Sequence, residues 1–229
     1  MSKPAIDFQQ IYQTFWARFI EAWEKAGASV SPRSSPFLQK YTDKTTVCIE
    51  LKEPIHLMKC VWRPDSPKNI DILITGYESL KLKSQPLVTA SGIKVNYFEV
   101  AKRQASLIEC IHYDYIETPQ DKHPVFHAQL SDECIDQAEI EKSETFSKYT
   151  LTSKQQGRIR TIKLPTAHMG FASVLCGILA DHTNITQTDF SARLKIVNEM
   201  AGLPKPCIET LTGKIQADNH SFRGLCWYQ

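Results

Sequence analysis

The stretch from Leu107 to Leu130 (LIECIHYDYIETPQDKHPVFHAQL) alternates apolar and polar residues on both sides of a polar segment. Successive side chains of a β-strand point to opposite faces of a sheet, so this period of two indicates two strands. Residues 117–122 (ETPQDK) between them have the composition of a loop. The stretch predicts an antiparallel β-hairpin, and a chain that contains it has to build a sheet.

The apolar pattern of the two arms fixes the parity of their register, because a slip by one residue would turn one arm inside out. The register that we expect pairs Tyr113 with Phe126, Ile111 with Ala128, and His112 with His127. Tyr113 and Phe126 should then lie on the buried face.

Four titratable residues gather on the opposite face of this predicted hairpin, namely His112, Asp114, His123 and His127. They allow three interpretations. A histidine oriented by Asp114 could act as a general acid or base, with phosphate-contacting chemistry. The imidazoles and the carboxylate could instead bind a divalent metal. Finally, the face could be an ordinary polar surface that meets water or hydrogen-bonds to whatever covers it.

A second group of basic residues lies further along the chain. Arg158 and Arg160 belong to an expected strand over residues 158–164, and His168 lies at the start of the apolar helix predicted after it. Arginines and a helix N-terminus are suited to a phosphate or carboxylate. The alternative is local capping by His168 and pairing of the arginines with the acidic segment before them.

Composition narrows the class of protein. The 229 residues carry a net charge of only +2, so bulk charge does not imply nucleic-acid binding. The seven cysteines are odd in number and form no CxxC pair, which is typical of reduced thiols. No N-terminal secretory pattern and no apolar run of about 20 residues is present, so we expect a cytoplasmic protein without a membrane partner.

The remaining elements follow from periodicity and turn residues. We expect an amphipathic helix over residues 5–26, a loop over 29–40, and further strands over 46–52, 56–63, 70–77 (with an extension to 83), 87–89 and 93–100. Ser91-Gly92 reads as a turn between the last two strands. Residues 131–156 are polar, and we interpret them as a long loop, a short helix at 132–137 or a mobile lid.

The C-terminal part predicts two helices. An apolar helix follows Thr166, which suits its N-cap, and places Val174, Leu175, Ile178 and Leu179 in the core. A second helix covers residues 190–201. The chain as a whole predicts one α+β domain over residues 1–229. It consists of the N-terminal helix, a largely antiparallel sheet of six to eight strands within residues 45–164, and C-terminal helices 167–202 packed on one face.

The segments HYDY, HPVFHAQL and RIRTIKLPTAHMGFASVL resemble uncharacterised bacterial proteins of mobile and defence loci. Those proteins pair a hairpin rich in tyrosine and histidine with a strand that ends in an R-x-P pattern, whereas Lys163 and Leu164 intervene here. The resemblance covers the second half of the chain and implies a bacterial accessory protein that acts with a partner. It carries over no catalytic role.

The sequence leaves two functional hypotheses. In the first, the protein is a hydrolase directed at nucleotides or nucleic acids in a defence or toxin–antitoxin type system. In the second, it is a non-catalytic adaptor that offers the acidic segment 131–145 and a sheet edge to a protein partner. No phosphate-binding glycine loop, GxSxG elbow or HExxH motif occurs in the chain, so whether it is an enzyme stays open.

Overall fold

The computed structural model describes residues 7–61, 69–82, 87–116, 126–131, 137–152, 162–165 and 170–182. The helices in this part are α1 (Phe8–Lys25), α2 (Gln137–Glu141), the 3-10 helix η1 (Phe146–Lys148) and α3 (Phe171–Asp181). The strands are β1 (Ser29–Ser31), β2 (Phe37–Tyr41), β3 (Thr46–Leu51), β4 (Ile55–Val61), β5 (Asn69–Lys81), β6 (Leu87–Ala101), β7 (Gln104–Ile116), β8 (Phe126–Ser131), β9 (Thr150–Thr152) and β10 (Ile162–Pro165).

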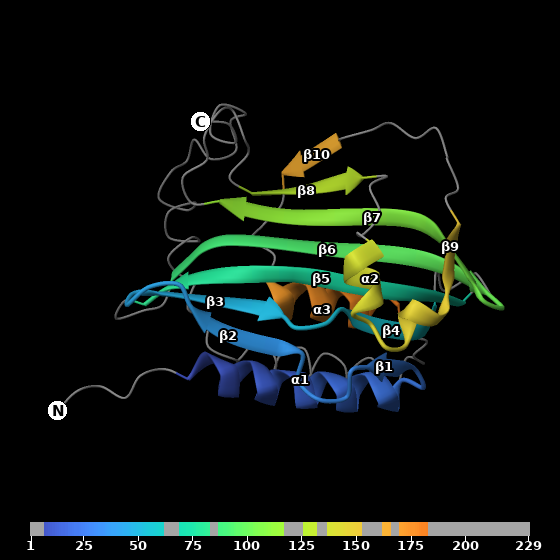
Figure 1. Ribbon diagram of the computed structural model, residues 1–229, viewed down its shortest axis with the longest axis horizontal. Coiled ribbons are helices and arrows are strands. Elements are labelled where there is room, and N and C mark those ends of the chain that lie inside the picture. Colours follow the sequence, from blue (N-terminus) through green and yellow to red (C-terminus); the bar gives the residue numbers. More distant parts are fainter. Residues whose placement is uncertain are drawn as a thin grey trace.

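The strands form one sheet in the order β1-β4-β5-β6-β7-β8-β10, with β3 also pairing with β5 and β2 with β3 (Figure 1). Every pairing is antiparallel except that of β9, which runs parallel to β7. Strands β4 to β8 are neighbours in sequence order, as antiparallel pairs joined by simple connections are, whereas β1 pairs with β4 and β10 with β8. The α+β class with an N-terminal helix and a largely antiparallel sheet is therefore confirmed.

The sheet has a hydrophobic layer on each face. Helices α1 and α3 cover one face and pack on the alternating residues Ile70, Ile72 and Ile74 of β5. Segment 137–152 packs on part of the opposite face, where Ile140 and Phe146 are buried against Leu73, Phe98 and Ala105. Figure 1 shows α2 and α3 on opposite sides of the sheet. We call these faces the helix face and the open face.

Helix α1 begins three residues later than predicted. The side chain of Asp7 accepts a hydrogen bond from the backbone N–H of Gln10 and serves as the N-cap. The helix ends at Lys25, and Gly27 follows with a φ of 79°, as expected just past a helix end. Its apolar stripe is largely buried, with Phe8, Phe15, Phe19 and Trp23 at most 2% exposed.

Two segments predicted as loop and turn are strands. Residues 29–40 contain β1 and most of β2, because Phe37 is buried against rings of α1 and α3. Ser91 and Gly92 lie inside the continuous strand β6. A Cβ atom on Gly76 would come within 2.3 Å of the Gly92 carbonyl oxygen, so Gly76 permits close approach of two strands.

One helix prediction also needs correction. The N-cap of α3 is Gly170 and not Thr166, and the N–H of Phe171 donates to the buried carboxylate of Glu78. In the acidic segment the structure describes helix α2 at 137–141, with Ile140 buried, whereas residues 132–136 of the short helix considered there lie outside the described residues. The second predicted C-terminal helix, residues 190–201, lies outside the described residues.

Candidate functional site

The predicted hairpin exists as β7 and β8, in a register two residues away from the expected one. Its pairs are Tyr115 with Phe126, Asp114 with His127, Tyr113 with Ala128, and His112 with Gln129. The expected pairing of His112 with His127 is therefore wrong. A shift of two residues keeps the parity, so each strand position stays on the predicted face of the sheet.

His112 and Asp114 form a close pair on the open face. Nε2 of His112 lies 2.9 Å from Oδ1 of Asp114, and the two side chains keep 27% and 21% of their surface exposed. They are two residues apart on β7, which places them on the same face of a strand. A carboxylate bonded to one ring nitrogen orients the imidazole and leaves the other nitrogen for chemistry.

Gly92 forms the floor beneath this pair. A Cβ atom at this position would lie 3.1 Å from the ring of Tyr77, 3.4 Å from Oδ1 of Asp114 and 3.6 Å from Nε2 of His112. The missing side chain therefore allows three functional groups from β5 and β7 to converge above β6. Tyr77 is 43% exposed, and burial, followed by the charges of Asp114 and Cys48, raises the pKa of its phenol.

Lys94 supplies a cation beside the pair. It lies on β6 directly opposite His112 on β7, and opposite Thr75 on β5. The lysine is half-buried. Positions 94, 112 and 129 thus form one row across the open face, and positions 77, 92 and 114 form the next. Together the two rows hold a base, a carboxylate, a phenol and a cation.

The other predicted site residues are placed only in part. The backbone of His127 pairs with Asp114 on β7, but its side chain lies outside the described part of the structure. Four further residues lie wholly outside that part, namely His123, Arg158, Arg160 and His168. Among residues that the structure describes, no group of three or more His, Cys, Asp or Glu side chains could hold a metal.

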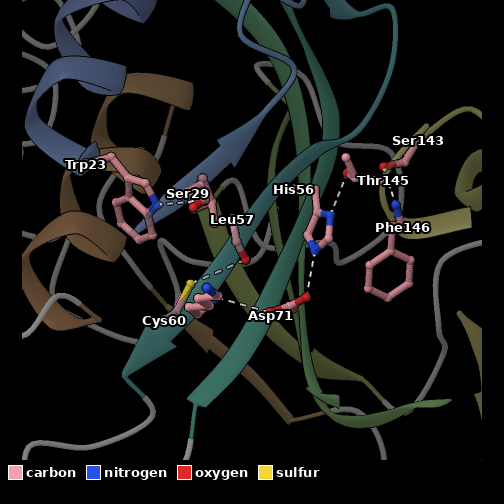
Figure 2. Close-up of polar contacts among 10 residues, drawn as sticks. Trp23, Ser29, His56, Leu57, Cys60, Asp71, Ser143, Thr145 and Phe146 are labelled. Atoms are coloured by element: carbon pink, nitrogen blue, oxygen red, sulfur yellow. Dashed lines mark hydrogen bonds and ion pairs between the residues drawn. The ribbon is translucent and has the colours of Figure 1, made fainter. Parts of the chain in front are cut away.

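A second polar cluster on the open face was not predicted. His56 of β4 is fully buried, with Nε2 2.8 Å from Oδ2 of Asp71 on β5 and Nδ1 2.7 Å from Oγ1 of Thr145 (Figure 2). Thr145 directly precedes η1 and is half-buried. A hydroxyl, an imidazole and a carboxylate therefore form a chain of hydrogen bonds from near the surface into the interior.

A β-bulge explains why pattern reasoning missed this cluster. The β4–β5 register shifts between Leu57 and Cys60, and Lys59 in the bulge has a φ of 60°, which residues with side chains rarely adopt. Its N–H donates to the second carboxylate oxygen of Asp71 at 3.1 Å. No glycine marks this bulge, so no residue pattern indicates that His56 and Asp71 meet.

His182 has the structural role that its position suggests. It is the C-cap of α3, and its Nδ1 lies 2.9 Å from the carbonyl oxygen of Val61. The N–H of Val61 in turn donates to the carbonyl oxygen of His182. These bonds attach the end of α3 to the end of β4.

Comparison of the chain with family models, curated proteins and solved structures gives no match. Within the described ranges, no helix is both long enough and apolar enough to cross a membrane. The chemistry of the open face is therefore what can indicate a function.

Proposed function

We propose that the protein is a hydrolase that cleaves a phosphate ester of a nucleotide or nucleic acid on the open face of its sheet. The observation that carries this proposal is the His112–Asp114 pair at 2.9 Å, with Lys94 on the adjacent strand and Gly92 as the floor. An oriented imidazole provides general-base catalysis, and an ammonium group neutralises phosphate charge.

Each group has a role in the proposed reaction. His112 removes a proton from the attacking water, and Asp114 holds its ring and stabilises the imidazolium that forms. Lys94 contacts the phosphate. The phenol of Tyr77 stays protonated because its pKa is raised, so it can donate a proton or a hydrogen bond to the leaving oxygen. His123, His127, Arg158, Arg160 and His168 are proposed as further acid–base and phosphate-binding groups.

The experiment measures hydrolysis of a panel of nucleotides and short RNAs, with and without a chelator. His112→Gln should lower the rate by about 100-fold, within the usual contribution of a general base. Lys94→Gln should weaken substrate binding and raise KM, because it removes the phosphate contact. Lys81→Gln is the matched control, since Lys81 is an exposed lysine at the end of β5.

The alternative function is that of an adaptor, and strand β2 favours it. Within the described part of the chain, β2 pairs with β3 alone, and its last residue, Tyr41, is 63% exposed. Unpaired backbone groups at a sheet edge can pair with a strand of another protein. The adaptor function would be preferred over the hydrolase function under two conditions. The folded protein would hydrolyse nothing in the panel, and it would co-purify stably with the product of a neighbouring gene.

A further inference from the structure

The cluster of Thr145, His56 and Asp71 has the connectivity of a catalytic triad. Both oxygens of Asp71 are acceptors, one for the N–H of Lys59 and one for Nε2 of His56. An ionised carboxylate can only accept hydrogen bonds, so Nε2 of His56 carries the proton. Nδ1 is then an acceptor, and the hydroxyl of Thr145 donates to it.

The surroundings hold these groups in place. Phe146 and Tyr149 contact the imidazole of His56 edge-on, with ring centroids 5.1 Å and 6.4 Å away. The N–H of Phe146 donates to the hydroxyl of Ser143, which fixes the turn before η1 (Figure 2). Thr145 occupies the N-cap position of η1, yet its hydroxyl makes no capping hydrogen bond there. That hydroxyl points to the imidazole instead.

We propose that Thr145 is a nucleophile for the carbonyl group of a neutral ester or thioester, with His56 as its general base and Asp71 as a positioning residue. This activity is separate from the proposed phosphate-ester hydrolysis. Strands β4 and β7 are three strand spacings apart, so His56 and His112 lie about 14 Å apart across the sheet.

The charges and rings around Thr145 select this class of substrate. Segment 137–152 carries three acidic residues, Glu139, Glu141 and Glu144, and two basic residues, Lys142 and Lys148. Glu144 is exposed and directly precedes Thr145. An anionic phosphate would be repelled here, whereas an uncharged acyl group can pack against the half-buried ring of Tyr149.

The proposed reaction has two steps. The Oγ1 atom of Thr145 attacks the carbonyl carbon while its proton moves to Nδ1 of His56, and the bond from carbon to the leaving oxygen or sulfur breaks. The leaving group takes the proton from His56, so an ester remains on Thr145. A water molecule then attacks this ester, passes a proton through His56 to Oγ1, and releases the carboxylic acid.

The experiment uses the intact protein and p-nitrophenyl acetate as the probe. Release of p-nitrophenolate is followed by absorbance, and the acetylated residue is located by peptide mass spectrometry. We expect the wild-type protein to carry an acetyl group on Thr145. The Thr145→Val variant should carry none at that position and should release p-nitrophenolate about 100-fold more slowly, the usual effect of losing an activated group. Ser147→Ala, which changes another hydroxyl of η1, should behave as wild type.

Two further variants separate catalysis from a structural role. Asp71→Asn should slow acetylation at least about tenfold, because an amide donates to Nε2 and inverts the tautomer of His56. Thr145→Ser should keep acetylation at position 145, because serine supplies the same hydroxyl. Acetyl found on lysines alone, or a Thr145→Ser protein unmodified at position 145, would overturn the proposal.

Discussion

Glu78 shows how one buried residue connects three elements. Its carboxylate accepts a hydrogen bond from the hydroxyl of Tyr12 on α1 and another from the N–H of Phe171 at the start of α3. The side chain comes from β5 and is 3% exposed. Gly170, the N-cap of α3, makes no side-chain capping bond, so Glu78 satisfies a helix N–H from a distant part of the chain.

Burial raises the pKa of Glu78 above its ordinary value of 4.5, although both hydrogen bonds act in the opposite direction. Between that ordinary value and the higher folded-state pKa, the folded protein binds more protons than the unfolded chain. The contribution of Glu78 to stability is therefore complete below pH 4.5 and is lost as the pH rises through the folded-state pKa.

Glu78→Gln should remove this pH dependence, because glutamine stays neutral. The variant should gain stability relative to wild type as the pH rises from about 4 to 7.5, by about 1.4 kcal/mol for each unit by which the wild-type pKa is raised. Urea unfolding at both pH values measures the difference. A difference in free energy of unfolding that does not vary with pH would contradict the assignment.

At the scale of elements, α3 is the helix whose burial the sequence predicted most directly. Its run FASVLCGILAD is apolar on most sides, and Val174, Leu175, Ile178 and Leu179 are all at most 5% exposed. Helices that are apolar nearly all round are normally buried. Here the helix shares the core with α1 on the helix face of the sheet.

Leu175→Ala should lower the free energy of unfolding by about 2–5 kcal/mol, since it removes a fully buried leucine side chain. Ser173→Ala on the same helix is the matched control, because Ser173 is half-buried and should change stability by about 0.5 kcal/mol or less. Denaturant unfolding compares the two variants. A loss below about 0.5 kcal/mol for Leu175→Ala would mean that α3 contributes little to the core.

In the whole molecule, the helices pack on one face of the sheet and the two polar clusters lie on the other. The helix face is filled by α1 and α3, while the open face carries both the His112–Asp114 pair and the cluster around His56. Alternation along β5 and β7 makes this division possible, because neighbouring residues of a strand serve different faces. Substitutions on the open face can therefore change chemistry without disturbing the helix packing.

The described cysteines, Cys48, Cys60, Cys110 and Cys176, form no disulfide with one another. Burial raises the pKa of Cys176 to about 11 and raises that of Cys60 well above its ordinary value. Because the thiolate is the reactive form, iodoacetamide should modify Cys176 in the native protein about 100-fold more slowly than in the unfolded chain at the same pH.

Peptide mass spectrometry after timed labelling, with and without urea, measures these rates for each cysteine. The same peptides from unreduced protein should show no disulfide among the four, and a native disulfide there would contradict the reducing compartment expected from the sequence. Equal labelling of Cys176 in the native and unfolded states would show that the helix face opens readily.

The periodic features of this protein could be predicted from its residue pattern. The stripe of α1, the apolar run of α3, the parity of the β7–β8 hairpin and the antiparallel order of the central strands all follow from residue types at spacings of two or 3.6. These features survive because a face of a helix or strand is a local property. A two-residue error in register leaves them unchanged, so His112 and Asp114 were placed on the correct face although their cross-strand partners were not.

The contacts between residues distant in the sequence could not be predicted from that pattern. The register of three strands places Gly92 inside a strand, beneath Tyr77 and Asp114, and not in a turn. The bulge at Lys59, which contains no glycine, brings His56 next to Asp71. Thr145 lies beside them because the adjacent Phe146 is buried against the open face of the sheet. Such contacts depend on strand register and packing over long sequence separations, and these are set by the summed burial of the whole core, not by local pattern.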